Sequence, residues 1–305
     1  MLLGLAGDSA SGKSTLSRGI EYILGAERVG RVCTDDYHRY DRKERALLGV
    51  TPLDPEANRM DLLEEHLRDL ADGRPISKPI YDHTTGTLLP EEKVEPGEIV
   101  IVEGLLPLAS RGPRDAIDVA VFLEPDEDLR RRWKVERDVS QRGYTRAQVL
   151  SEIEHRENDA ARHVRPQRDV ADIIVRFYRR DGSADDDAHL SCRLTIRPTL
   201  PYPGLRELVG SLSGRGLEPI RWSLATDRRG PMSVLDVDGH CPPEVGAEIE
   251  DVVWSYLHPD HRLQRDRIGM VLRSGGDGER SEALALAQLL IVSHLVGALD
   301  GAFEL

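Results

Sequence analysis

The chain has 305 residues, and its 54 Asp and Glu outnumber its 41 Lys and Arg to give a formal charge of −13. This size and composition are typical of a globular protein with a sizeable core, in one large domain or two. The acidic balance argues against general nucleic-acid binding, which needs a broad basic surface, and no apolar run reaches the ~18–20 residues of a membrane span. The start of the chain lacks the basic segment of a signal peptide, and the three cysteines are too widely spaced for a disulfide or zinc framework. These features predict a cytoplasmic protein.

The first predicted strand, residues 2–6, leads through a glycine-rich turn into a predicted helix at residues 13–24. The turn matches G-x-x-x-x-G-K-[ST], in which glycines let backbone N–H groups surround phosphate oxygens. Lys13 would reach the β- and γ-phosphates of ATP, and the Ser14 hydroxyl would ligate Mg²⁺. The alternative, an ordinary glycine-rich turn, is disfavoured by the strand–turn–helix context. The predicted nucleotide-binding residues are Gly7, Asp8, Ser9, Ala10, Ser11, Gly12, Lys13, Ser14 and Thr15.

Acidic residues follow two further predicted strands. Asp35 and Asp36 lie at the end of a strand predicted over residues 28–34, and Glu103 follows the apolar run at residues 99–102. The carboxyl ends of parallel strands form the ligand-binding edge of such a sheet. We therefore predict Asp36 as the base for an acceptor hydroxyl and Glu103 as the acid on the metal side. Helix capping by Asp35 or Asp36 is the alternative interpretation.

The pattern of alternating strands and helices continues to about residue 180. The predicted elements after the second strand are a helix at 58–71, a long proline-containing loop at 73–90, strands at 98–102 and 117–123, and helices at 126–141 and 145–163, the last with Thr145 as its N-cap. This alternation predicts an α/β fold with a doubly wound, mostly parallel sheet of the P-loop NTPase type.

A basic block lies within this acidic chain. Residues 130–180 contain 14 Lys or Arg and 8 Asp or Glu. Such a block suits a phosphorylated small ligand, whose charges must be met at one site. A solvated, arginine-rich helix face is the alternative.

The pattern changes after Arg180, where an acidic break at residues 181–187 interrupts the chain. The elements predicted beyond it are strands at 190–196, 218–224 and 233–237 and terminal helices at 244–256 and 281–299. We therefore predict a nucleotide-binding core with a lid at residues 1–180 and a β-rich extension at residues 181–305, packed on the same sheet.

Several motifs together resemble the phosphoribulokinases, specifically their plant, cyanobacterial and archaeal-type branch. The first two motifs are the glycine-rich turn and residues 35–42, Asp-Asp-Tyr-His-Arg-Tyr-Asp-Arg. The others are residues 53–58 (LDPEAN), 78–86 (KPIYDHTTG), 133–143 (WKxxRDxxxRG), 166–167 (PQ) and 171–172 (AD). The resemblance is dense over about residues 1–178 and weaker at residues 233–239.

The resemblance implies ATP-dependent phosphorylation of D-ribulose 5-phosphate to ribulose 1,5-bisphosphate, with Mg²⁺. By position, it implies Asp36 as the base, Glu103 as a metal ligand with Ser14, and Lys13 and Asp138 as further catalytic residues. The residues expected to contact the sugar phosphate are His38, Arg42, Tyr81, His83, Lys134 and Arg156. Arg137 and Arg142 would close over the nucleotide phosphates as part of a lid. Arg130, Arg131 and Arg132 are expected at the surface.

The chain departs from the family pattern at two positions. Leu106 stands where the family usually has a His after the acidic strand, which leaves the acceptor open. Ser11 replaces one of the two cysteines of the redox-switched enzymes while Cys33 keeps the other, so we expect no disulfide switch between these positions. A kinase for uridine or another small hydroxylated acceptor is the first alternative, and a nucleotide-dependent regulatory protein is the second. The resemblance also implies a homodimer.

Overall fold

The computed structural model describes residues 1–180, 189–198, 210, 219–255, 257, 261–271 and 279–299. The chain divides into two compact units. The first comprises Met1–Lys13 and Glu27–Ala171, and the second comprises Ser14–Ala26 and Asp172–Leu305. The predicted division after residue 180 stays a prediction, and the acidic break at 181–187 lies outside the described residues.

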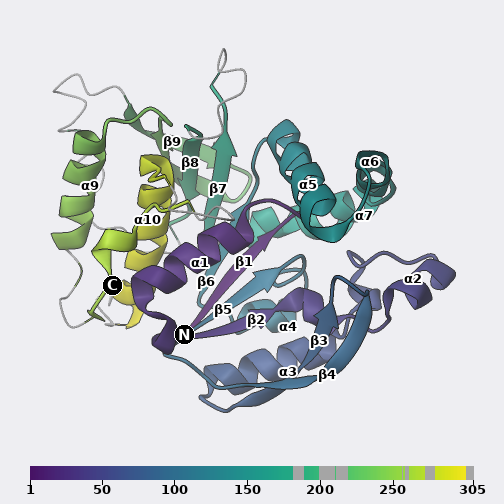
Figure 1. Ribbon diagram of the computed structural model, residues 1–305. Coiled ribbons are helices and arrows are strands. Elements are labelled where there is room, and N and C mark those ends of the chain that lie inside the picture. The colour runs from purple at the N-terminus through teal and green to yellow at the C-terminus, as the bar shows by residue number, and fades with distance from the viewer. Residues whose placement is uncertain are drawn as a thin grey trace. The chain divides into compact units, whose positions relative to one another are not determined.

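The first unit contains a fully parallel sheet (Figure 1). Its strands, in spatial order, are β2 (Val29–Cys33), β5 (Ile99–Gly104), β1 (Leu2–Gly7) and β6 (Val119–Leu123). All residues of β1 and β6 are buried, as expected of parallel strands covered on both faces. The register places Leu5 and Cys33 on either side of Glu103, so the carboxyl ends of strands β1, β2 and β5 lie at the same edge of the sheet.

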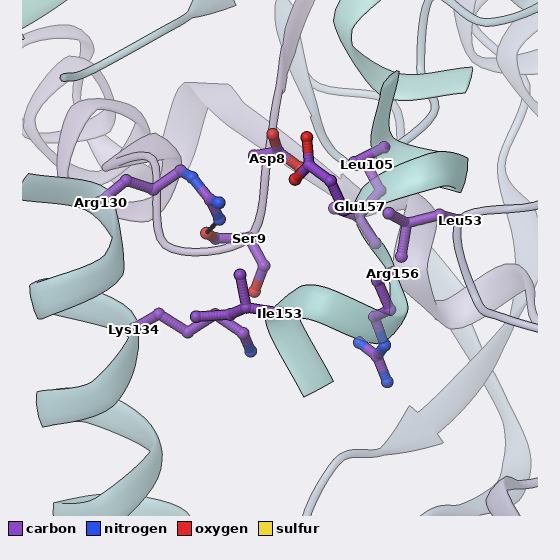
Figure 2. Close-up of a pocket in the computed structure, with 10 residues that line it drawn as sticks. Asp8, Ser9, Leu53, Leu105, Arg130, Lys134, Ile153, Arg156 and Glu157 are labelled. Atoms are coloured by element: carbon purple, nitrogen blue, oxygen red, sulfur yellow. Dashed lines mark hydrogen bonds between the residues drawn. The ribbon is translucent and has the colours of Figure 1, made fainter. Parts of the chain in front are cut away.

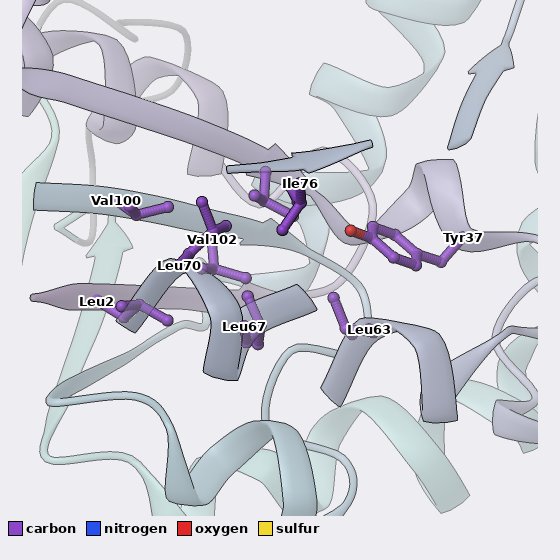
Figure 3. Close-up of a cluster of buried hydrophobic side chains, with 9 residues drawn as sticks. Leu2, Tyr37, Leu63, Leu67, Leu70, Ile76, Val100 and Val102 are labelled. Atoms are coloured by element: carbon purple, nitrogen blue, oxygen red, sulfur yellow. The ribbon is translucent and has the colours of Figure 1, made fainter. Parts of the chain in front are cut away.

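The core of this unit forms between the sheet and helix α3 (Met60–Ala71). Figure 3 shows Leu63, Leu67 and Leu70 projecting from α3 toward Val100 and Val102 of β5. Their spacing of three and four residues puts them on one helix face, as the sequence predicted. Each fully buried leucine contributes about 1.5–3 kcal/mol.

A β-hairpin replaces the long loop that we predicted at residues 73–90. Strands β3 (Ile76–Asp82) and β4 (Thr87–Val94) pair in antiparallel fashion, with a register shift between Lys78 and Ile80. The prediction was wrong because Pro79 argued against a strand, whereas the shift at this position accommodates its missing N–H.

Helices make up the rest of the unit. The segment that follows β6 contains α5 (Glu127–Arg142), α6 (Arg146–His155), α7 (Glu157–Asp159), a π turn at Ala160–Val164 and a 3-10 helix, η5, at Arg165–Val170. Thr145 caps α6 with a capping box to Gln148, which confirms the predicted N-cap. The single helix predicted at 145–163 is instead interrupted after residue 155. Shorter helices are η1 (Ala26–Arg28), η2 (Thr34–Tyr37), α2 (Arg42–Leu48), η3 (Pro55–Ala57) and α4 (Arg111–Asp115).

The second unit contains an antiparallel sheet whose strands, in spatial order, are β7 (Ile173–Tyr178), β8 (Ser191–Ile196), β10 (Gly230–Val237) and β9 (Ile220–Asp227). Its helices are α1 (Lys13–Leu24), α9 (Pro243–Ser255), η7 (Arg265–Arg267) and α10 (Glu282–Leu299). The strands predicted at 190–196, 218–224 and 233–237 and the two terminal helices are confirmed within the described residues, whereas β7 was missed. Among the described helices, none combines the length and hydropathy needed to cross a membrane.

Candidate active site

The glycine-rich turn joins the end of β1 to the start of α1, as predicted. A Cβ on Gly7 would lie 2.6 Å from the Leu123 carbonyl oxygen, so only glycine fits there. Gly12 and Ala10 have φ angles of 95° and 64°, in the region that favours glycine. The Lys13 ammonium donates to the carbonyl oxygens of Gly7 and Asp8, at 2.8 Å each. The backbone therefore curls around the lysine, as a phosphate-binding loop requires.

Carboxylates surround the Lys13 ammonium. Burial lowers the pKa of Lys13, and the negative charges of Asp35, Glu103 and Asp8 act in the opposite direction. The lysine thus lies where the two acidic strand ends and the phosphate loop converge. Ser14 and Thr15 follow as the first residues of α1 beyond Lys13.

The Asp36 carboxylate contacts the β3–β4 hairpin. One of its carboxylate oxygens accepts from Lys78 Nζ at 2.7 Å, and the other accepts from the Tyr81 backbone N–H at 3.0 Å. Both partners of the ion pair are buried, with side-chain exposures of 8% for Lys78 and 11% for Asp36. Both oxygens of Asp36 are therefore engaged in docking the hairpin, which argues against the predicted role of Asp36 as the base.

Asp35 is half-buried and contacts the segment after β5 instead of the hairpin. Its Oδ1 accepts from the Leu105 N–H at 3.0 Å. Its charge acts to raise the pKa of Lys13 and of His83, against the lowering that burial produces in both groups. A Cβ on Gly104 would lie 2.0 Å from Thr34 Oγ1 and 3.0 Å from Asp35 Oδ1, so glycine permits this close approach.

Glu103 ends β5 beside this turn and pairs with Arg31 at 2.6 Å. Within the described ranges, no group of three or more His, Cys, Asp or Glu could hold a metal ion by itself. Mg²⁺ usually takes one or two carboxylates and completes its shell with phosphate and water. The hard oxygen donors at Glu103 and Asp35, beside a phosphate-binding loop, fit that chemistry.

Aromatic rings predicted to contact the sugar form a cluster centred on Tyr81. The Tyr81 ring makes edge contacts with His38, at 4.7 Å between centroids, and with His83, at 5.1 Å. His38 Nδ1 hydrogen-bonds to Asn58 Oδ1 at 2.7 Å. Arg45, which the sequence did not single out, donates to the Tyr81 hydroxyl at 2.6 Å. The structure thus brings His38, Tyr81 and His83 together.

His38 should make folding stability depend on pH. Burial is the main cause that lowers the pKa of His38 from 6.5 to about 4. Because the unfolded chain binds the proton first, this contribution to stability is complete above the unfolded pKa and is lost as the pH falls from about 6.5 to 4. We expect the stability advantage of the wild type over His38→Gln, measured by urea unfolding, to shrink by about 3 kcal/mol between pH 7 and pH 4. A constant difference across this range would contradict the prediction.

Arg42, the first residue of α2, contacts the tip of the hairpin. Its guanidinium donates to the carbonyl oxygens of His83, at 2.5 Å, and Thr84, at 3.5 Å. Its backbone N–H donates to the Gly86 carbonyl oxygen at 2.8 Å. Arg42 therefore fixes the loop that carries His83, whose ring contacts the ring of Tyr81.

The predicted lid residues gather around Asp138, which is almost fully buried. Its carboxylate lies 2.7 Å from Lys134 Nζ, 2.9 Å from Arg137 Nε and 3.4 Å from an Arg142 nitrogen. Arg137 also donates to Ser9 Oγ at 3.1 Å. One carboxylate shared by three cations leaves an excess of positive charge beside the phosphate loop. The structure thus brings together the predicted lid residues Arg137 and Arg142, the predicted catalytic residue Asp138 and the predicted sugar-phosphate contact Lys134.

Figure 2 shows the pocket beside this cluster, with Arg130 and Lys134 projecting from α5 and Arg156 approaching from the other side of Ser9. Arg130 is buried and donates to the Ser9 carbonyl oxygen at 3.2 Å, so the expected surface position of Arg130 was wrong. Arg156 is half-buried and pairs with Glu152 at 2.5 Å. Burial lowers the pKa of Arg156, and the nearby charge of Arg45 contributes in the same direction.

Several residues of this site carried no role in the sequence interpretation. Lys78 and Gln167 lay in motifs that matched the family, and Arg130 lay in the basic block, so position alone could have drawn attention to them. Asn58 also lay in a matched motif, at residues 53–58, whereas Arg45 had no distinguishing signal beyond its neighbourhood. Leu106, which replaces the usual His, is buried in an apolar cluster with Leu53, Leu105, Ala160 and Val164.

Comparisons with known proteins cover the part of the chain that carries this site. Residues 2–181 match the model of the Phosphoribulokinase / Uridine kinase family. The phosphoribulokinase of Synechocystis sp. is 43% identical over 175 residues, covering 57% of this chain and 53% of that protein. The chloroplastic phosphoribulokinase of Spinacia oleracea is 32% identical over 204 residues, covering 61% and 51%. The chain thus spans about half the length of these relatives.

A uridine kinase from Ligilactobacillus salivarius is 34% identical over 179 residues, covering 57% of this chain and 84% of that enzyme. Among solved structures, the phosphoribulokinase from Rhodobacter spheroides aligns with a TM-score of 0.56 at 18% identity, covering 78% of this chain and 90% of that one. This structural likeness confirms the predicted fold class. With the family model matching more than half of its length, the chain belongs to the Phosphoribulokinase / Uridine kinase family.

Proposed function

We propose that the chain is an ATP- and Mg²⁺-dependent kinase that phosphorylates the primary hydroxyl of D-ribulose 5-phosphate to give ribulose 1,5-bisphosphate. The position of Asp35 is the observation that carries the proposal. Its charge acts on Lys13 of the phosphate loop and also on His38, His83 and Arg142. A base between the nucleotide phosphates and the acceptor is what in-line phosphoryl transfer requires.

We assign the base to Asp35 in place of the predicted Asp36. Within the described part of the chain, the second carboxylate oxygen of Asp35 accepts no hydrogen bond, whereas Asp36 uses both oxygens on Lys78 and Tyr81. Asp35 would accept the hydroxyl proton as the acceptor oxygen attacks the γ-phosphate. Asp36 would hold the hairpin on which Tyr81 and His83 lie.

Cationic residues support a phosphorylated acceptor. Lys13 would bind the β- and γ-phosphates, and Arg137 and Arg142 would neutralise charge that develops during transfer. Lys134 and Arg156 line the adjacent pocket and would bind the sugar phosphate. When bound through Ser14 and Glu103, Mg²⁺ would neutralise charge on the β- and γ-phosphates.

The similarity to the two phosphoribulokinases agrees with this substrate, while the similarity to a uridine kinase keeps uridine as the second candidate. We test them by measuring ADP release from ATP and Mg²⁺ with ribulose 5-phosphate, unphosphorylated ribulose or uridine as the acceptor. The proposal expects ribulose 5-phosphate to be preferred over ribulose because of the cationic clamp. Turnover on uridine alone would contradict it.

The Arg42→Ala variant should separate sugar binding from nucleotide binding. Without its guanidinium, the carbonyl oxygens of His83 and Thr84 lose their donor and the sugar side of the site loosens. We expect KM for the sugar phosphate to rise about tenfold, which corresponds to about 1.4 kcal/mol, with KM for ATP nearly constant. Initial rates at varied concentrations of each substrate measure both values. Equal changes in the two KM values would refute the role.

A cytoplasmic location and a homodimer remain part of this proposal. The homodimer is supported by the resemblance and by strand β9, which lies at the edge of the second unit's sheet with Leu224 exposed.

A further inference from the structure

Gln167 is a buried amide that joins two segments of the first unit. It lies in η5, and 2% of its surface is exposed. Its Oε1 accepts from the Leu108 N–H at 2.8 Å, and its Nε2 donates to the Leu105 carbonyl oxygen at 2.7 Å. Nε2 also lies 3.2 Å from the carbonyl oxygens of His163 and Val164. One side chain therefore ties the loop after β5 to the end of the helical segment that carries the lid residues.

The loop that Gln167 holds also holds Asp35. The Leu105 residue accepts from Gln167 through its carbonyl oxygen and donates to Asp35 Oδ1 through its N–H. A route of two hydrogen bonds thus runs from Gln167 through Leu105 to Asp35. The Leu105 N–H and C=O belong to successive peptide groups that meet at the Leu105 Cα, so Gln167 anchors one of these groups while Asp35 accepts from the other.

Apolar packing alone does not define this orientation. Leu105 and Leu106 pack with Leu53, Ala160 and Val164, and such contacts are non-directional. Hydrogen bonds depend steeply on angle and so set the direction of a loop that leucines only bury. Gln167 is the polar group with bonds to both Leu105 and Leu108.

We propose that Gln167 is a positioning residue for Asp35, acting through the backbone of Leu105; this inference rests on the proposed role of Asp35 as the acceptor base. Gln167 touches neither substrate nor reacting atoms. It sets the carboxylate that must lie within hydrogen-bond reach of the acceptor hydroxyl. Displacing a reacting group by about 1 Å can cost about 10²-fold in rate.

The test is the Gln167→Met variant, which keeps the side-chain length and removes all four hydrogen bonds. We expect kcat to fall about 10- to 100-fold. KM for ATP should stay within about twofold of the wild-type value, a change that corresponds to less than 1 kcal/mol. Activity is measured with the acceptor that the wild type turns over, so a wrong acceptor assignment shows in the wild type and not in the variant. A wild type that transfers phosphate to no acceptor would overturn the proposed function and this inference together.

The matched control is Gln288→Met in the second unit. Gln288 is also buried, and its Oε1 accepts from the Gly269 N–H at 2.8 Å. Gln167→Met should unfold at lower urea concentration, because it loses four buried hydrogen bonds, whereas the control loses the one from Gly269. Only Gln167→Met should lose kcat. A folded Gln167→Met variant with wild-type kcat, or an equal loss of kcat in the control, would overturn the inference.

A second measurement separates positioning from general destabilisation. In an Asp35→Asn background the base is already absent, so adding Gln167→Met should change the residual kcat less than about twofold, since coupled residues act non-additively. A full additional loss would show that Gln167 acts by another route and would overturn the inference. If Gln167→Met fails to fold, Gln167→Asn replaces it, because this shorter amide stays polar but cannot reach both Leu105 and Leu108.

Discussion

The Asp35→Asn variant is expected to lose about 10²–10⁴-fold in kcat, the range that a general base contributes. The amide is nearly the same size and its oxygen can still accept from the Leu105 N–H, so the fold around it should persist. What it loses is the ability to accept the proton of the acceptor hydroxyl. KM for ATP should change little, because Lys13 and the phosphate loop keep their contacts. Initial-rate kinetics with ribulose 5-phosphate measure both quantities.

Asp36→Asn provides the matched control, since the same change is made one residue along the chain. The amide can still accept from the Tyr81 N–H but no longer balances the charge of Lys78. This variant should therefore lose mainly stability, and its kcat should fall much less than that of Asp35→Asn at a temperature where both are folded. The opposite ranking of the two variants would return the role of base to Asp36.

This pair of residues also marks the limit of the sequence interpretation. The strand, the glycine-rich turn and the helix were predicted correctly because the motif constrains the backbone locally. The acidic pair at the end of β2 was also placed correctly. Which of the two carboxylates is engaged by the hairpin depends on Lys78, which pairs with Asp36 from 42 residues further along the chain. A contact at that separation leaves no trace in the local pattern.

The hairpin illustrates the same limit. Its prolines predicted a loop, yet a register shift at Pro79 allows β3 to pair with β4. Because Lys78 and Tyr81 lie on β3, missing the strand also hid the partners of Asp36. The surface position expected for Arg130 was wrong for a related reason: the arginine-rich block suggested a solvated helix face, and only the fold places Ser9 beside Arg130. Helix α3, by contrast, was predicted from its apolar spacing because it buries that face on its own unit's core.

Removing Asp36 altogether should be among the most destabilising single changes in the first unit. The Asp36→Ala variant leaves the Lys78 ammonium buried without its carboxylate, and breaking a buried pair in this way typically costs about 3–5 kcal/mol. Glu92 lies 3.7 Å from Lys78, but its side chain is 63% exposed, so it compensates only in part. Urea unfolding followed by circular dichroism measures the loss. Asp61→Ala is the control, because Asp61 pairs with Arg39 at the surface, where removing a partner typically costs about 0–1 kcal/mol.

The double variant Asp36→Ala/Lys78→Met shows whether charge is the cause. With both ions gone, no uncompensated charge remains in the interior, and methionine fills much of the space of the lysine stem. Its free energy of unfolding should therefore lie well above the value expected from adding the losses measured for Asp36→Ala and Lys78→Met separately. The Tyr81 N–H still lacks an acceptor, so recovery should stop short of the wild type. Strict additivity of the two losses would mean that Asp36 and Lys78 stabilise the hairpin independently.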